Sequence, residues 1–268
     1  MSRLKEIFNN LKIKGQKAFS VFLMSGYPDN ETFLDLLKLS ADVGVDFIEV
    51  GMPFSDPSAD GPIIKKAGAL ALEKGTTVKK TIESVKEFRK YDNKTPIVWM
   101  GYFNSIYNYG VNNFLNDIAN AEVDGLLVVD LPIEEFSRLE NIKEKNIDVI
   151  NLVTPVTTKD RLSRILTNAS GFIYFVSITG ITGTKEAQED KIKNQVEYIK
   201  TQTDLPVVVG FGIKTAEKAR HINSFADGAI VGSALVNQIS KFTDEFGKIK
   251  DKKTLFKEIK TFVQTFIE

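Results

Sequence analysis

Cysteine is absent from this sequence of 268 residues, and histidine occurs once, as His221. Without cysteine the chain can form no disulfide, no thiolate metal site and no cysteine nucleophile. A single histidine excludes a multi-histidine metal centre, and its position inside an expected helix disfavours histidine acid–base catalysis. We therefore expect neither a metal ion nor another cofactor.

Net charge and long apolar runs are also missing. The 35 Lys and Arg residues balance the 35 Asp and Glu residues, which gives no electrostatic case for a nucleic acid or an anionic membrane as partner. No apolar run is long enough to span a bilayer. Residues 3–12 are amphipathic but include Glu6, which favours a short helix packed under the fold over a transit peptide. The cytoplasm is the expected location.

Short apolar runs alternate with longer segments of helical period, a pattern typical of parallel strands with helical crossovers. The eight runs are residues 18–24, 46–50, 96–100, 125–129, 148–153, 171–177, 206–209 and 228–231. An open doubly wound sheet usually carries a glycine-rich fingerprint after its first strand, and residues 24–28 do not match one. The pattern predicts an α/β fold, a single (β/α)₈ TIM barrel over residues 1–268 with extra N-terminal and loop helices.

Helices are expected between these runs, with Asn30, Thr157 and Thr215 as N-caps. Their ranges are residues 31–43, 77–91, 111–121, 158–168, 190–202, 215–225 and 255–267. The intervening residues 178–189 carry few bulky apolar side chains and are interpreted as a mobile lid, with a disordered loop as the alternative.

Glycines follow the last strands of the expected barrel. Gly210 and Gly212 come after the seventh strand, Gly232 and Ser233 after the eighth, and residues 180–184 after the sixth. Barrel enzymes often bind phosphate in these loops, where glycine lets backbone N–H groups approach an anion. The pattern indicates a phosphate site, with ordinary turns as the alternative.

Two acidic residues stand out near the end of the second strand. Glu49 interrupts an apolar strand, and a buried carboxylate is costly unless it is paired or functional. Asp60 lies in the following loop, where capping the helix that Pro62 opens is an equally good explanation. The strand cores hold no lysine for a Schiff base. Carboxylate acid–base chemistry remains, and carbon–carbon cleavage by it needs a substrate that is its own electron sink, such as an indole ring.

The sequence resembles the tryptophan synthase alpha subunit family over nearly its whole length. The most specific stretch is residues 49–62, EVGMPFSDPSADGP, supported by residues 100–104, 130–132, 177–183 and 210–213. The resemblance implies cleavage of indole-3-glycerol phosphate, with Glu49 as the main acid–base residue and Asp60 holding the indole N–H. It also implies a set of substrate contacts: Phe22, Met100, Leu127, Tyr174, Thr182, Gly183, Phe211, Gly212, Gly232 and Ser233.

The resemblance further implies a pyridoxal-phosphate beta subunit as partner in an α₂β₂ complex. Aromatic and apolar residues after the third strand, from Phe103 to Tyr109, fit an interface, although a local hydrophobic cluster explains them as well. The chain departs from the family pattern at Ile63, Lys65 and Ser105, beside the acids rather than on them. A non-catalytic barrel that activates the beta subunit, or a lyase that works alone, are the alternatives.

Overall fold

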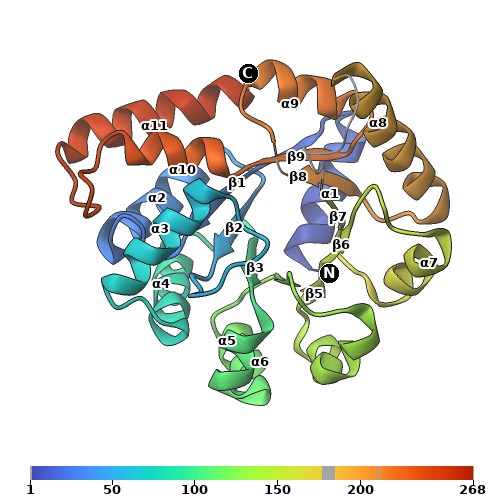
Figure 1. The fold of residues 1–268 in the computed structure, drawn as a ribbon, viewed down its shortest axis with the longest axis horizontal. Coiled ribbons are helices and arrows are strands. Elements are labelled where there is room, and N and C mark those ends of the chain that lie inside the picture. Colours follow the sequence, from blue (N-terminus) through green and yellow to red (C-terminus); the bar gives the residue numbers. More distant parts are fainter. Residues whose placement is uncertain (1, 177–184, 211, 268) are drawn as a thin grey trace.

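The computed structural model describes residues 2–176, 185–210 and 212–267 (Figure 1). Three of the expected substrate contacts, Thr182, Gly183 and Phe211, lie outside the described residues. So does most of the expected lid.

The strands form one parallel sheet in the order β5-β4-β3-β2-β1-β9-β8-β7-β6. They are β1 (Ala18–Met24), β2 (Phe47–Gly51), β3 (Ile97–Gly101), β4 (Gly125–Val128), β5 (Asp148–Val149), β6 (Asn151–Val153), β7 (Ile173–Val176), β8 (Val207–Gly210) and β9 (Gly228–Val231).

The sheet nearly closes on itself at the fifth expected strand. That strand is divided at Ile150 into β5, which pairs with β4, and β6, which pairs with β7. The Ile150 N–H still donates to the Leu126 carbonyl at 2.9 Å, so the two short strands continue one another across the gap. The prediction of a (β/α)₈ barrel is confirmed.

Helices surround the strands in Figure 1. They are α1 (Arg3–Ile13), α2 (Asn30–Asp42), α3 (Pro62–Glu73), α4 (Val78–Tyr91), α5 (Phe103–Tyr109), α6 (Val111–Asn120), the 3₁₀ helix η1 (Ile133–Lys145), α7 (Lys159–Asn168), α8 (Lys185–Gln202), α9 (Ala216–Asn223), α10 (Ser233–Ser240) and α11 (Lys252–Ile267). None of the described helices combines the length and the apolar character that a membrane crossing needs.

Two of the three expected N-caps are off by one residue. The Asp29 carboxylate, rather than Asn30, caps α2 by accepting the Thr32 N–H at 2.8 Å. Thr158 caps α7, because the hydroxyl of Thr157 already accepts a hydrogen bond from the Thr154 N–H at 3.0 Å. The expected cap at Thr215 is confirmed. Helix α8 begins at residue 185 rather than 190, so the last part of the expected lid is helical.

The amino ends of the strands are sealed by α1, as its amphipathic pattern predicts. Leu4 and Phe8 are buried, and the Phe8 ring packs 6.0 Å from Phe47 and 5.8 Å from Phe172. Burying a phenylalanine side chain contributes about 1.5–3 kcal/mol. Helix α1 thus closes the amino end of the barrel, and the opposite, carboxyl end stays open for a site.

A buried ion cluster ties the same end together. The Asp124 carboxylate accepts hydrogen bonds from Arg3 at 2.9 Å, from Arg89 at 2.6 Å and from the Ile97 N–H at 2.8 Å. These contacts join α1, α4 and the start of β3 to the residue before β4. The burial of Asp124 raises its pKa, and the two guanidinium groups oppose that rise. The cluster is structural, because it lies at the closed end of the barrel.

Candidate active site

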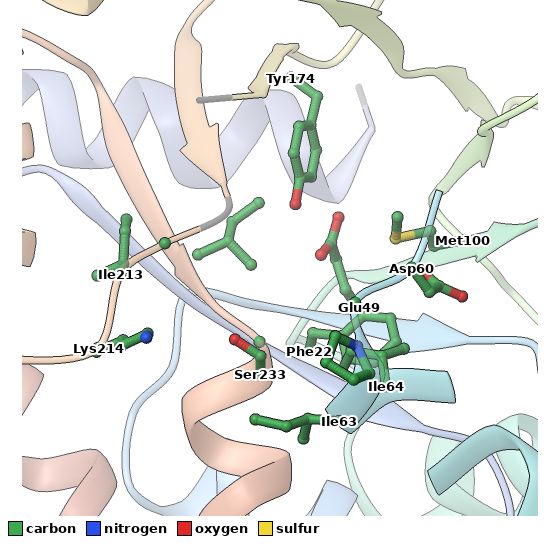
Figure 2. Close-up of a pocket in the computed structure, with 15 residues that line it drawn as sticks. Phe22, Glu49, Asp60, Ile63, Ile64, Met100, Tyr174, Ile213, Lys214 and Ser233 are labelled. Atoms are coloured by element: carbon green, nitrogen blue, oxygen red, sulfur yellow. The ribbon is translucent and has the colours of Figure 1, made fainter. Parts of the chain in front are cut away.

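A cavity of about 280 Å³ opens at the carboxyl ends of the strands (Figure 2). Its lining combines two acidic residues, apolar side chains, and glycines from the loops after β8 and β9. The lining residues are Phe22, Glu49, Asp60, Gly61, Pro62, Ile63, Ile64, Met100, Tyr174, Gly212, Ile213, Lys214, Ile230, Gly232 and Ser233.

Glu49 lies on β2, flanked in register by Phe22 of β1 and Val98 of β3, and its side chain is completely buried. No described basic residue forms an ion pair with it, and neither carboxylate oxygen accepts a hydrogen bond of ordinary geometry from the described residues. Loss of hydration raises the pKa of Glu49 to about 8. At neutral pH this side chain is therefore a carboxylic acid that can give up a proton, and once ionised it becomes a strong base.

Tyr174, on β7, faces Glu49 across the barrel. Figure 2 shows its hydroxyl and the Glu49 carboxyl pointing toward each other. Proximity of the hydroxyl partly offsets the rise in the Glu49 pKa. Burial first, and then the charges of Glu49 and Asp60, raise the pKa of Tyr174 well above its usual range. Its hydroxyl thus stays protonated and can donate to the Glu49 carboxylate when that forms.

Two glycines make room for the aromatic rings of the cavity. A Cβ on Gly210 would lie 2.1 Å from the Tyr174 hydroxyl oxygen, and one on Gly51 would lie 2.2 Å from the Phe22 ring. Real Cβ atoms do not approach other atoms so closely, because overlap at this distance is strongly repulsive. The glycine at each position is therefore what allows the neighbouring ring to reach its place.

Asp60 lies in the loop that joins β2 to α3, on the cavity wall. Its interpretation as a helix cap is wrong, because Gly61 is the N-cap of α3 and makes no side-chain capping bond. Burial raises the pKa of Asp60, while a hydrogen bond from Tyr102 and the charge of Lys65 oppose the rise. The Tyr102 hydroxyl also accepts the Ala59 N–H at 3.1 Å, so one tyrosine holds this part of the loop.

Two of the three glycine-rich loops of the predicted phosphate site, those after β8 and β9, line the same cavity, and the third, residues 180–184, lies outside the described residues. Gly212 follows β8 with φ +76°, a conformation that favours glycine, and Gly232 is the N-cap of α10. Ser233 begins that helix and lines the cavity. A helix N-terminus that has no side-chain cap presents free N–H groups, which suit an anion.

Leu127 is the one expected contact within the described residues that does not line the cavity. It is fully buried and pairs with Met100 in the register of β3 and β4.

Among the described residues we find no group of acidic or histidine side chains that could hold a metal ion. The site can therefore hold an apolar ring beside two carboxyl groups and an anion at the glycine end.

Comparison with known proteins identifies the family of this chain. The sequence matches the family described as tryptophan synthase alpha chain over residues 8–267. The chain belongs to that family. Its members act as lyases in tryptophan biosynthesis, and this chain has the role of an alpha subunit.

Solved structures agree with this assignment. A tryptophan synthase alpha chain from Legionella pneumophila subsp. pneumophila is 33% identical, with a TM-score of 0.88, and the match covers 99% of this chain and 96% of that one. A tryptophan synthase from M. tuberculosis in an aminoacrylate-bound form is 30% identical, with a TM-score of 0.86 and coverage of 99% and 98%. A structure from Aquifex aeolicus VF5 is 38% identical, with a TM-score of 0.84 and coverage of 97% and 98%.

Several residues of the cavity lining were not expected from the sequence. They come from the first turn of α3 and from the segments around Gly212 and Gly232, and they are Gly61, Pro62, Ile63, Ile64, Ile213, Lys214 and Ile230. Pro62 carried a signal, as a residue that fits the first turn of a helix. Lys214 follows Gly212 by two residues, so its position in the predicted phosphate-binding loop after β8 could have singled it out.

Proposed function

We propose that this alpha chain cleaves indole-3-glycerol phosphate to indole and glyceraldehyde 3-phosphate, with Glu49 and Asp60 as its acid–base pair. The observation that carries the proposal is a fully buried Glu49, without an ion-pair partner among the described residues, that faces an open apolar cavity. A carboxyl group in such a place is costly to stability, and a proton-transfer role accounts for its presence.

The first chemical step is protonation of the indole ring. The neutral Glu49 carboxyl donates its proton to the C3 carbon of the indole, and the ring nitrogen takes on the positive charge. Asp60, ionised and on the cavity wall, accepts the indole N–H and stabilises that charge. Phe22, Met100 and Ile64 supply apolar surface for the flat ring.

The second step is cleavage of the bond between the indole C3 and the glycerol chain. The Glu49 carboxylate, now a strong base because it is desolvated, takes the proton from the adjacent hydroxyl group. The oxygen forms the aldehyde, and the electrons of the broken bond return to the ring and neutralise its charge. Glu49 ends protonated as it began, so the cycle needs no redox partner.

We further propose that the chain works with a beta subunit in an α₂β₂ complex in the cytoplasm. A groove of about 420 Å³ lies beside the loop that carries Asp60, and Pro53, Phe54 and Tyr109 are among the residues that line it. This groove supports the proposal, because it offers apolar surface for contact with a beta subunit. Tyr107 on α5 is exposed, whereas Ile106 is buried and belongs to the core rather than to an interface.

An indole-release assay tests the proposal. Purified alpha chain should release indole from indole-3-glycerol phosphate, and a beta subunit should raise the rate. Release that the beta subunit does not change would indicate a lyase that works alone. No release in either condition, with stimulation of the beta subunit, would indicate the non-catalytic barrel and would overturn the proposed chemistry.

A further inference from the structure

Lys214 places a positive charge at the glycine end of the cavity. It lies between β8 and α9, one residue before Thr215, the N-cap of α9. It lines the cavity together with Gly212, Gly232 and Ser233. In Figure 2, Lys214 and Ser233 lie on the side of the cavity away from Met100 and Asp60.

This lysine is the one basic side chain among the described residues that line the cavity. The acidic side chains of the lining, Glu49 and Asp60, lie toward the other end. The side chain of Lys214 is exposed, and among the described residues no carboxylate forms an ion pair with it. Its neighbour in the fold, Lys218, is paired with Glu189 instead. The charge of Lys214 is therefore available to a ligand.

We propose that the Lys214 ammonium binds the phosphate group of the substrate and determines the preference of the site for phosphorylated over unphosphorylated indole-glycerol. This inference rests on the proposed function, because it uses the same substrate orientation. With the indole ring between Glu49 and Asp60, the glycerol chain carries the phosphate toward Gly212, Gly232 and Ser233.

Backbone N–H groups and a hydroxyl supply directed hydrogen bonds but no full charge, whereas a phosphate monoester carries close to two negative charges at neutral pH. A lysine ammonium on a flexible stem adds a point charge without a demand for one fixed geometry. Because the group is exposed, solvent and salt weaken its attraction. The contact is thus expected to contribute to affinity in a salt-dependent way.

The test compares Lys214→Met and Lys214→Arg with the wild-type protein, on indole-3-glycerol phosphate and on indole-3-glycerol. Lys214→Met should lower kcat/KM for the phosphorylated substrate by about tenfold, as expected for one charge-assisted contact at a partly exposed site. The preference for the phosphorylated substrate should fall by the same factor, and Lys214→Arg should restore most of it. Lys260→Met, which removes an exposed lysine of α11 outside the cavity lining, is the matched control.

A salt titration separates binding from a structural role. The wild-type KM should rise with salt more steeply than that of Lys214→Met, because the variant has lost one charge at the phosphate. An equal loss on both substrates, or an unchanged preference, would overturn the inference.

Glycerol 3-phosphate distinguishes this inference from the proposed function. Its dissociation constant, measured by calorimetry, should rise about tenfold in Lys214→Met even if the wild-type protein released no indole. An unchanged dissociation constant alongside normal indole release would show that Lys214 does not bind the phosphate, and would leave the proposed chemistry intact.

Discussion

At the scale of single residues, the proposed chemistry depends on one proton carried by Glu49. The change Glu49→Gln keeps the size of the side chain and removes its ability to take or give a proton. Turnover should fall by at least about a hundredfold, within the usual contribution of a general acid–base group. Binding of glycerol 3-phosphate should persist, since the anion end of the cavity is untouched. Indole release and calorimetry measure the two effects. Normal turnover in this variant would mean that Glu49 is not the acid of the reaction.

The raised pKa of Glu49 also predicts the pH dependence of the wild-type protein. The free protein needs Glu49 protonated, so kcat/KM should decline above a pH of about 8. It also needs Asp60 ionised, and burial raises the pKa of that group. On the acidic side, kcat/KM should therefore begin to fall at a pH above the usual pKa range of an aspartate. A pH profile of kcat/KM measures both limbs. A profile that stays flat well beyond pH 8 would contradict the role of Glu49.

At the scale of residues, the sequence was most informative where a side chain was unusual for its position. A carboxyl group inside an apolar strand is conspicuous, and the structure places Glu49, buried, in the lining of the cavity, while its catalytic role stays a prediction. Leu127 was assigned to the substrate by resemblance alone, and the structure places it in the core. Ile213 and Ile230 were missed because an isoleucine looks the same in a cavity wall as in a core.

At the scale of elements, strands β7 and β8 position Tyr174 only because Gly210 has no side chain. Gly210→Ala should displace the Tyr174 ring and destabilise the fold by about 1–3 kcal/mol, as overpacked cores do, while lowering turnover. Thermal unfolding and indole release measure the change. The control is Gly68→Ala in α3, where the nearest atom would lie at an ordinary 3.5 Å and a helical alanine is favoured over glycine. Equal stability of the two variants would show that Tyr174 can move aside freely.

The N-terminal helix provides a second test at this scale, because α1 supports the barrel from the end away from the site. Phe8→Ala should reduce the free energy of unfolding by about 3–5 kcal/mol, since it leaves a cavity against Phe47 and Phe172. Denaturant unfolding measures this, with the exposed Ile13→Ala on the same helix as control. The KM for substrate should hardly change in either variant. A large change in KM for Phe8→Ala would mean that the packing of α1 affects the geometry of the site.

The short apolar strands and the longer helices with a clear period were predictable, whereas some short helices were not. The pattern placed α2, α4, α6, α7, α9 and α11 to within a few residues. Helices α5 and α10 span only 7 and 8 residues and have no side-chain cap to mark where they begin, whereas α9, equally short, begins after the Thr215 cap. The division of the fifth strand at Ile150 was not predicted either, although the polar Asn151 directly follows the break.

At the scale of the whole molecule, Glu49 should lower stability as the price of function. Its pKa in the folded protein is about 8, above the value of about 4.3 for a glutamate in an unfolded chain. Between these two values the folded protein holds a proton that the unfolded chain has released. Its contribution is therefore most favourable below the lower value and declines as the pH rises toward 8, by up to about 1.4 kcal/mol per pH unit.

Glutamine at position 49 has no such titration, so Glu49→Gln should be more stable than the wild-type protein at pH 8, and the difference should shrink toward pH 5. Denaturant unfolding of both proteins across this range measures the difference directly, and the other titrating groups cancel because the two proteins share them. A constant difference across the range would mean that the carboxyl group at position 49 is hydrated or partnered in the folded protein. The same loss of hydration that makes Glu49 a usable acid would then be absent, and the proposed proton transfer would lose its physical basis.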